Sequence, residues 1–296
     1  MKIAYLILAH KNPQLLKRLI KTLSCENCAF FIHIDKKSGI EEFSGIAGGN
    51  VFFSRERIPV YWGEFSQVQA VLLLLRQALE SPQQYDYFVL MQGSDYPLRS
   101  GAYIHKFLEE NRGMEFMDLV KMPAPGKPLS RVNTVRYPSD KPVRRLVSRI
   151  LAKLGLAQRD HRKYLGSLAP YSGSACWTLT RDACQYTLQF MERNPHVEKF
   201  FRNTSACDEA LFHTILGNSA FASQIRRSLV YTDWSAEDAH PAAINDGHLA
   251  FFEAQEKVPL NDVYGSGEAL FARKFSDDNL ALPERIDEMI LRKEKH

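Results

Sequence analysis

The chain has 296 residues, of which 45% are hydrophobic and 24% charged, so it can bury a sizeable core in one large α/β domain or two small ones. No apolar run reaches the roughly 18 residues of a membrane-spanning helix, and the first ten residues predict a buried strand and not a signal peptide. Five cysteines, three of them isolated, argue against a complete disulfide framework. They favour a reducing compartment and hence a cytoplasmic protein.

The net charge of +4 is unevenly distributed. Between residues 127 and 163 there are eleven Lys or Arg and two Asp, a local excess of nine, so the rest of the chain is net acidic by five. A basic patch of this kind predicts an anionic partner.

The first hundred residues alternate apolar, β-rich runs with amphipathic helical stretches, a pattern typical of a parallel sheet with crossover helices. Residues 3–9 predict the first strand, and the apolar face of residues 13–22 predicts a helix. Cys25 and Cys28 follow that helix instead of opening one, which favours incidental loop cysteines over a redox motif or a zinc site. Further strands are expected at 30–34, 51–53 and 87–91, and further helices at 67–79 and from Pro97 to about Asn111.

This rhythm breaks in a basic, Pro-containing stretch from 122 to 163. Within it, residues 143–156 predict a short amphipathic helix, with Arg144, Arg145, Arg149 and Lys153 around an apolar face of Leu146, Val147, Ile150, Leu151 and Leu154. The apolar face can pack on the core, or the helix can dock on an anionic membrane or acceptor, and the sequence leaves both open. A strand at 174–180 and helices at 181–193 and 207–216 follow, and the remainder reads as loop-rich. We expect one domain over residues 1–296 with a basic insertion at about 123–165.

Ligands of such sheets bind beyond the carboxyl ends of the strands. Asp35 follows the strand at 30–34 and Asp95 the strand at 87–91, so both are placed for a nucleotide and its sugar. The alternative for each is a turn or helix cap.

Eight segments between Ala4 and Phe275 carry a resemblance to a known family. In order they are AYLILAHKNPQLLKRLIKTL, FFIHIDKKS, YWGEFSQVQAVLLLL, YFVLMQGSDYPLRS, YSGSACWTLTRDAC, CDEALF, YTDWS and LFARKF. Here the chain resembles the core-2/I-branching β-1,6-N-acetylglucosaminyltransferase family, which includes peptide xylosyltransferases and bacterial members. The resemblance implies an α/β, GT-A-like, Rossmann-type fold with a mixed, mostly parallel sheet flanked by helices. It also implies an inverting glycosyltransferase with a nucleotide-sugar donor.

The family lacks the Asp-x-Asp metal motif, and no Asp-x-Asp follows a predicted strand here, so no metal or other cofactor is expected. Something preorganised must then hold the charge that develops on the departing diphosphate. The family lysine matches Lys274 in LFARKF. Its arginine has no clear match, and Arg273, which adjoins the lysine, is ranked ahead of Arg226 and Arg227.

Inverting transfer needs one base that takes the proton of the acceptor hydroxyl. The family base matches Glu209 in CDEALF. Adjacent residues on a helix point about 100° apart, so we expect Asp208 to cap or orient and Glu209 to act as the base. The alternative is that Glu209 is a first-turn helix residue without a catalytic role.

The resemblance also implies the substrate contacts. Leu8 and Asp35 match residues that contact the uracil of a UDP-sugar, and Asp95 is grouped with them on the donor side. Trp234 in YTDWS matches an aromatic residue against which acceptor sugars pack, and Glu115 a carboxylate that binds an acceptor hydroxyl.

The resemblance says less about which sugar is transferred and which acceptor receives it. Trp62 and Glu64 in YWGEFS resemble the xylosyltransferase-like and bacterial branches more than the mucin-branching enzymes, so the resemblance leaves the transferred sugar open. N-acetylglucosamine is the first expectation and xylose or glucose the second. A glycan or lipid-linked glycan is the expected acceptor, in bacterial surface polysaccharide synthesis at the inner face of the membrane. An inactive nucleotide-sugar-binding homologue is the alternative. Nucleic-acid binding is not expected, because the basic stretch lacks an aromatic platform.

Overall fold

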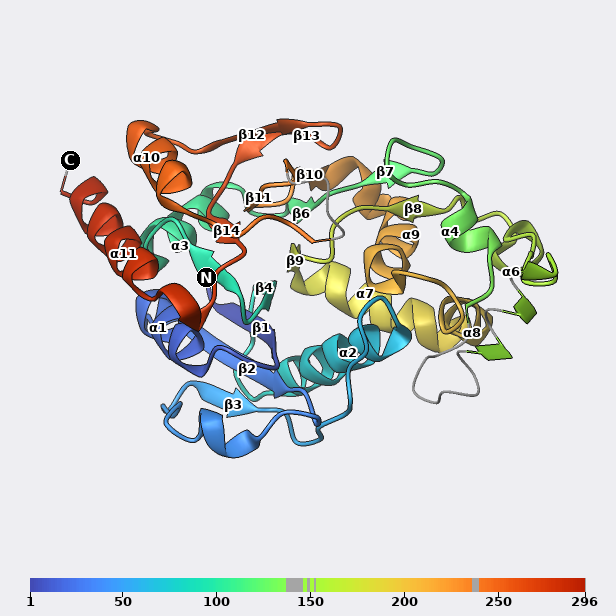
Figure 1. Cartoon of the computed structure of the whole chain (residues 1–296), viewed down its shortest axis with the longest axis horizontal. Helices are drawn as coiled ribbons and strands as arrows, with labels where there is room; N and C mark the ends of the chain where they lie inside the picture. The colour runs from blue at the N-terminus through green and yellow to red at the C-terminus, as the bar shows by residue number, and fades with distance from the viewer. Residues whose placement is uncertain (137–145, 148–149, 152, 236–239, 296) are drawn as a thin grey trace.

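A seven-stranded sheet forms the centre of the computed structural model, which describes residues 1–136, 146–147, 150–151, 153–235 and 240–295 (Figure 1). The strand order is β10-β6-β9-β4-β1-β2-β3. The strands are β1 (Ile3–Ala9), β2 (Cys28–Ile34), β3 (Val51–Phe53), β4 (Tyr87–Gln92), β6 (Glu115–Met117), β9 (Trp177–Thr180) and β10 (Ile225–Arg226). Only β9 runs antiparallel to its neighbours, β4 and β6. The mixed, mostly parallel sheet predicted from the sequence is confirmed.

Helices cover both faces of this sheet (Figure 1). Alternate residues of β1 divide between two core clusters. Ile3, Tyr5 and Ile7 pack with α1 (Pro13–Leu23), α3 (Gly101–Glu110) and α11 (Ala281–Lys293). Ala4, Leu6 and Leu8 pack with α2 (Phe65–Leu79), α7 (Arg181–Arg193), α8 (Pro195–Phe201) and α9 (Leu211–Gly217). Burial on both sides explains why β1 reads as a continuous apolar run.

A second, three-stranded sheet joins distant parts of the chain. It contains β11 (Val230–Thr232), β14 (Phe271–Arg273) and β5 (Asp95–Pro97), and it places Arg273 opposite Asp95. β5 follows β4 after a tight approach to β1, in which a Cβ on Gly93 would lie 2.8 Å from the Cβ of Ala9. Only glycine fits there without a shift of the backbone.

The C-terminal part is more ordered than predicted. Instead of loops it contains α10 (Asp246–Ala254), a hairpin of β12 (Pro259–Asp262) and β13 (Gly265–Glu268), then β14 and α11. Helix α11 buries Leu282, Ile286, Met289 and Ile290. Pro283 lies in its first turn, where the backbone N–H has no partner within the helix.

The helix predicted at 207–216 is broken. Cys207–Glu209 form a 3₁₀ turn, and α9 begins only after Ala210, whose φ of −135° lies outside the helical region. The N-cap residues of the two elements are Ala206 and Ala210, neither with a capping side chain. The expectation that Asp208 caps this helix is therefore wrong. The strand predicted at 174–180 begins only at Trp177, which is buried.

The basic stretch contains α4 (Ser130–Asn133) and α6 (Arg162–Leu165), and short strands β7 (Val120–Lys121) and β8 (Tyr171–Ser172) flank it. Part of the helix predicted at 143–156, including Arg144, Arg145 and Arg149, lies outside the described residues. Of its apolar face, Leu146, Val147, Ile150 and Leu154 are between 43% and 63% exposed, so these four do not pack on the core. No helix of the described residues is long and apolar enough to span a membrane.

Candidate active site

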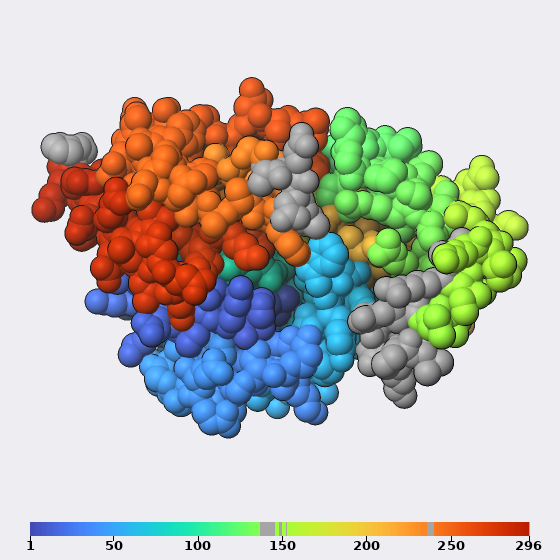
Figure 2. Space-filling model, in the orientation of Figure 1, coloured from blue at the N-terminus to red at the C-terminus, as the bar shows by residue number. Residues whose placement is uncertain are grey.

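The carboxyl ends of β1 and β2 form one wall of the candidate site. Asp35 follows β2, is 7% exposed and accepts hydrogen bonds from the backbone of Lys37 (2.9 Å) and Val60 (3.3 Å). Leu8 lies near the end of β1, beside His33 of β2 in the register, and packs in the core. These contacts fix both residues at the edge where the sequence predicted a nucleotide. In Figure 2 the N-terminal part, the light-blue segment around residue 60 and the C-terminal part meet around a hollow.

Cations gather at the same edge. Burial lowers the pKa of His10, and Lys11, Lys274 and Lys37 lower it further, while Asp35 opposes them. Burial, Lys11 and Arg273 likewise lower the pKa of Lys274. In the part of the chain that the structure describes, no carboxylate lies within 4 Å of the Lys274 ammonium group. An ammonium group among cations and without a carboxylate partner is suited to bind phosphate oxygens.

Arg273 extends this cluster toward β5. Its Nε lies 3.4 Å from Oδ1 of Asp95, which is 1% exposed, and its Nη1 lies 3.4 Å from Sγ of Cys176. Burial raises the pKa of Asp95, and Arg273 acts against it. Asp95 is thus part of the support that positions Arg273.

The other two arginines considered for the diphosphate are engaged elsewhere. Arg227 is 8% exposed and pairs with Asp118 and Asp262. Arg226 is exposed and donates to the carbonyl groups of Ser223 and Ile225. Of the three, Arg273 is the one beside Lys274.

Glu209 lies in the 3₁₀ turn before α9. Its Oε2 accepts from Lys127 Nζ and from Arg131 Nη1, both at 2.7 Å. Its backbone carbonyl accepts from the Ser172 hydroxyl (2.8 Å) and from the Gly173 N–H (3.0 Å). Burial would raise the pKa of Glu209, but Lys127 and Arg131 together outweigh it, and the pKa is lowered. The carboxylate is therefore oriented and ionised.

The segment that holds Glu209 depends on close backbone packing. A Cβ on Gly173 would lie 1.8 Å from the carbonyl oxygen of Asp118 and 2.8 Å from the His213 ring, so no larger residue fits. His213 is fully buried in α9, and burial lowers its pKa to about 3, so it is neutral. Neither Lys127 nor Arg131 was predicted as a site residue, and the only signal in the sequence was the local excess of basic residues that begins at Lys127.

Asp208 precedes Glu209 and lies in a different environment. The residue as a whole is partly exposed, but its Oδ1 is buried without a hydrogen-bond partner. Burial, and then Glu209, raise the pKa of Asp208 to about 7. The two neighbouring carboxyl groups therefore have pKa values shifted in opposite directions.

The two residues predicted to bind the acceptor, Trp234 and Glu115, differ in their exposure to solvent. Trp234 follows β11 and is 59% exposed, so its ring is accessible. Glu115 is 0% exposed, and its two oxygens accept from the backbone N–H (2.8 Å) and hydroxyl (2.5 Å) of Thr180 at the start of α7. The expected acceptor role of Glu115 is wrong, because both oxygens are used inside the protein. Asp118, three residues later, is also buried (3% exposed) and pairs with Arg227. Burial, Asp118 and Glu209 raise the pKa of Tyr264 to about 12.

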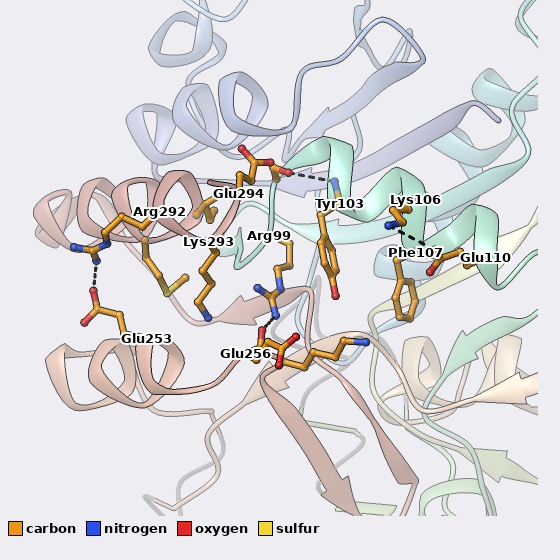
Figure 3. A pocket seen from close by; sticks show the side chains of 14 residues that line it. Arg99, Tyr103, Lys106, Phe107, Glu110, Glu253, Glu256, Arg292, Lys293 and Glu294 are labelled. Carbon is orange, nitrogen blue, oxygen red and sulfur yellow. Dashed lines mark hydrogen bonds and ion pairs between the residues drawn. The ribbon is translucent and has the colours of Figure 1, made fainter. Parts of the chain in front are cut away.

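One pocket lies away from the predicted site residues. It has a volume of about 830 Å³ and lies between α3, the end of α10 and α11, where Arg99, Tyr103 and Lys293 form part of its lining (Figure 3). None of the predicted site residues lines it. Among the described residues, no three His, Cys, Asp or Glu side chains are grouped to hold a metal ion.

Comparisons with known proteins identify the family of the chain. The family model that matches, over residues 3–254, is that of the Core-2/I-Branching enzymes, and the chain belongs to this family. Human xylosyltransferase 2 is 27% identical over 304 residues, which cover 93% of this chain and 32% of that protein. Cow beta-1,3-galactosyl-O-glycosyl-glycoprotein beta-1,6-N-acetylglucosaminyltransferase is 27% identical over 221 residues, which cover 72% of this chain and 48% of that protein.

The chain thus spans about a third of the length of the xylosyltransferases it matches. Among solved structures, apo mouse xyloside xylosyltransferase 1 aligns with 91% of this chain and 97% of its own, at 10% identity and a TM-score of 0.35.

Proposed function

We propose that this protein is an inverting, metal-independent glycosyltransferase that moves a sugar from a UDP-sugar to a hydroxyl group of a glycan. The observation that carries the proposal is the oriented and ionised Glu209 carboxylate. Two contacts support one site for Glu209, Arg273 and Lys274: the Gly173 N–H donates to the carbonyl of Glu209 (3.0 Å), and Cys176, three residues further on, lies 3.4 Å from Arg273.

In the proposed mechanism Glu209 takes the proton of the acceptor hydroxyl. The oxygen attacks the anomeric carbon, the new C–O bond forms, and the bond from that carbon to the diphosphate oxygen breaks on the opposite face. UDP leaves with the electron pair of the broken bond. Lys274 and Arg273 stabilise the negative charge on the diphosphate, as a bound metal ion does in other enzymes.

Asp35 and Leu8 are proposed to contact the uracil, and Trp234 to stack on an acceptor sugar. N-acetylglucosamine is our first candidate for the transferred sugar, and xylose or glucose the second, because the relatives include transferases named for the first two sugars. The competing function, nucleotide-sugar binding without catalysis, would not need the two cations that keep Glu209 ionised.

The deciding experiment measures turnover and binding of a panel of nucleotide sugars in the presence of EDTA. Wild type is compared with Glu209→Gln and Lys274→Ala, and Glu198→Gln, which removes a glutamate paired with Arg202 on α8, serves as the control. We expect one UDP-sugar to be turned over in EDTA, with activity lost in both site variants and kept in the control.

Two results would refute the proposal. Activity that requires an added divalent metal would exclude the metal-independent mechanism. Activity that survives Glu209→Gln would exclude Glu209 as the base. Binding without turnover of any sugar would support the inactive homologue.

We further propose that the enzyme works in the cytoplasm at the inner face of the membrane, on a lipid-linked glycan of a bacterial surface polysaccharide. The exposed apolar side chains between Leu146 and Leu154, within the basic stretch, support peripheral contact with an anionic bilayer.

A further inference from the structure

Cys25 and Cys28 are two neighbouring cysteines that the proposed transfer reaction does not use. They lie in the connection between α1 and β2, at the opposite end of β2 from Asp35. The sequence alone favoured incidental loop cysteines here, because no helix follows the pair. The structure adds contacts within the pair that the sequence does not contain.

The chain forms a tight turn at the pair. The backbone N–H of Cys28 donates to the carbonyl of Cys25 (3.3 Å), and Glu26 and Asn27 between them are in a turn conformation. In a turn closed by this hydrogen bond, the Cα atoms of the first and fourth residues lie less than about 7 Å apart. A disulfide needs a Cα separation of about 4.4 to 6.8 Å. The turn therefore brings the two Cα atoms into the range that a disulfide requires.

The sulfur atom of Cys28 lies against the main chain of Cys25. It accepts a hydrogen bond from the N–H of Cys25 (3.0 Å) and lies 3.1 Å from the carbonyl oxygen of the same residue. Those two groups flank the Cα atom from which the Cys25 side chain branches. The Cys28 sulfur is therefore within reach of the Cys25 side chain.

The two thiols differ in accessibility. Of the five cysteines, all of which lie in the described part of the chain, Cys25 is partly exposed and the other four are buried. Contact with Cys28 lowers the pKa of Cys25, although burial opposes it, whereas the same contact and burial raise the pKa of Cys28. A partly exposed thiol that ionises readily can attack a disulfide, and a buried thiol beside it can then resolve the product.

A metal site is the alternative use for two neighbouring cysteines. A structural zinc ion needs four ligands, usually Cys or His. In the part of the chain that the structure describes, no three His, Cys, Asp or Glu side chains are grouped to hold a metal ion. The further side-chain contact of the Cys28 sulfur is the amide of Asn50, whose Nδ2 lies 3.8 Å away. The surroundings of the pair therefore favour a disulfide over a metal ion.

We propose that Cys25 and Cys28 form a redox-active dithiol, which closes to a reversible disulfide by exchange with a small disulfide such as glutathione disulfide. The Cys25 thiolate attacks one sulfur of the small disulfide, which forms a mixed disulfide and releases one small thiolate. The Cys28 thiol then loses its proton and attacks the Cys25 sulfur, which closes the protein disulfide and releases the second small thiolate. The dithiol is oxidised by two electrons, and the small disulfide is reduced to two thiols.

The test uses the whole folded chain, which is first reduced, freed of reductant and then incubated with an excess of glutathione disulfide. Intact mass spectrometry detects the loss of two hydrogen atoms or the addition of glutathione, and digestion after alkylation locates the cysteines concerned. Wild type is compared with Cys25→Ser and Cys28→Ser. Cys184→Ser, which removes a buried cysteine of α7, is the matched control.

We expect wild type and Cys184→Ser to form a disulfide between Cys25 and Cys28, which reduced glutathione reopens. Cys28→Ser should stop at the mixed disulfide on Cys25 and hold about tenfold more of it than wild type, because the resolving thiol is missing. Cys25→Ser should form neither product, because its remaining thiols are buried. Resistance of Cys176 and Cys207 to alkylation shows that each variant is folded.

Three results would overturn the inference. The first is a folded wild type that keeps both thiols in excess glutathione disulfide. The second is a mixed disulfide on Cys25 that persists in wild type as it does in Cys28→Ser, which would show that Cys28 does not reach it. The third is a disulfide that joins either residue to another cysteine or to a second chain. The inference goes beyond the proposed function and is independent of it, since every readout is a mass and none is a rate of sugar transfer.

Discussion

Lys127 and Arg131 decide how Glu209 titrates. Both donate to the same oxygen, Oε2, and both side chains are partly exposed, so each ion pair is screened by water. Arg131→Gln removes one positive charge, which disfavours the carboxylate and raises the pKa of Glu209. We expect the acidic limb of the kcat profile to move to higher pH by about 0.5 to 1 unit.

The measurement is kcat from pH 4.5 to 7.5 for wild type and Arg131→Gln. Arg162→Gln, which removes an exposed partner of Asp160 in the same basic stretch, is the control and should leave the limb in place. If the acidic limb lies at the same pH in Arg131→Gln as in wild type, this limb does not report the ionisation of Glu209.

Arg273 and Lys274 are neighbours in the chain, but their replacement by Ala should affect the stability of the protein differently. Arg273 pairs with the buried Asp95, so Arg273→Ala leaves a buried carboxyl group without its cation and should cost about 2 to 4 kcal/mol of unfolding free energy. Lys274 has no carboxylate within 4 Å among the described residues, so Lys274→Ala should cost little stability. Both should lose about 100-fold or more in kcat.

Urea unfolding and initial rates separate the two effects. Lys274→Met, which keeps most of the side-chain volume, controls for lost packing. If Lys274→Ala unfolds as easily as Arg273→Ala, the lysine has a structural task that the ion pairs do not show.

At the level of elements, Glu115 joins β6 to the start of α7. Burial raises its pKa to about 7, and its hydrogen bonds from Thr180 only partly offset this. A folded-state pKa above the unfolded value of about 4.5 means that the folded protein binds the proton more tightly. The stabilisation is fully present below about pH 4.5 and is lost as the pH rises through 7.

The unfolding free energy should therefore decrease by up to roughly 3 kcal/mol between pH 4.5 and 8 through this one group. Glu115→Gln cannot ionise, so it should lose that part of the slope, measured by urea unfolding at several pH values. Glu110→Gln on the exposed side of α3 should keep the wild-type slope. Equal slopes in wild type and Glu115→Gln would show that Glu115 is not protonated in the folded state.

The long helices and strands could be predicted from the sequence. The short strands that pair with distant parts of the chain could not. Helix α1 shows its apolar periodicity, and strand β1 its continuous apolar run, in neighbouring residues of the sequence. Strand β5 has three residues and pairs with β14 from the far end of the chain, so no local pattern marks it. The break at Ala210 depends on the packing of Glu209 against Ser172 and Gly173, which lie far away in sequence.

The same reasoning applies to the site. Glu209 and Lys274 were found through the resemblance, because they lie in segments that match the family. Lys127 and Arg131 were missed because their contact with Glu209 spans about eighty residues. Glu115 and Asp118 are both acidic, buried and three residues apart, and only their partners distinguish them: Thr180 for Glu115 and Arg227 for Asp118.

At the level of the whole molecule, the basic charge and the exposed apolar side chains gather in one stretch of the chain. Leu146, Val147, Ile150, Leu154 and Leu156 are each at least 43% exposed, and eleven Lys or Arg lie between residues 127 and 163. Apolar side chains insert below the headgroups of a bilayer, and each nearby Lys or Arg adds about 1 kcal/mol on an anionic surface.

We therefore expect the protein to sediment with vesicles that contain anionic phospholipid and much less with zwitterionic vesicles. Replacement of Arg144, Arg145 and Arg149 by Gln should weaken binding to anionic vesicles at least tenfold, and Leu154→Ser with Leu156→Ser should weaken it further, because both the charge and the apolar contribution are then lost. Val263→Ser, which removes an equally exposed apolar side chain from the β12–β13 turn, should change nothing. Sedimentation that is the same for wild type and the arginine variant would show that this stretch does not bind the membrane, and its positive charge would then have to serve the acceptor.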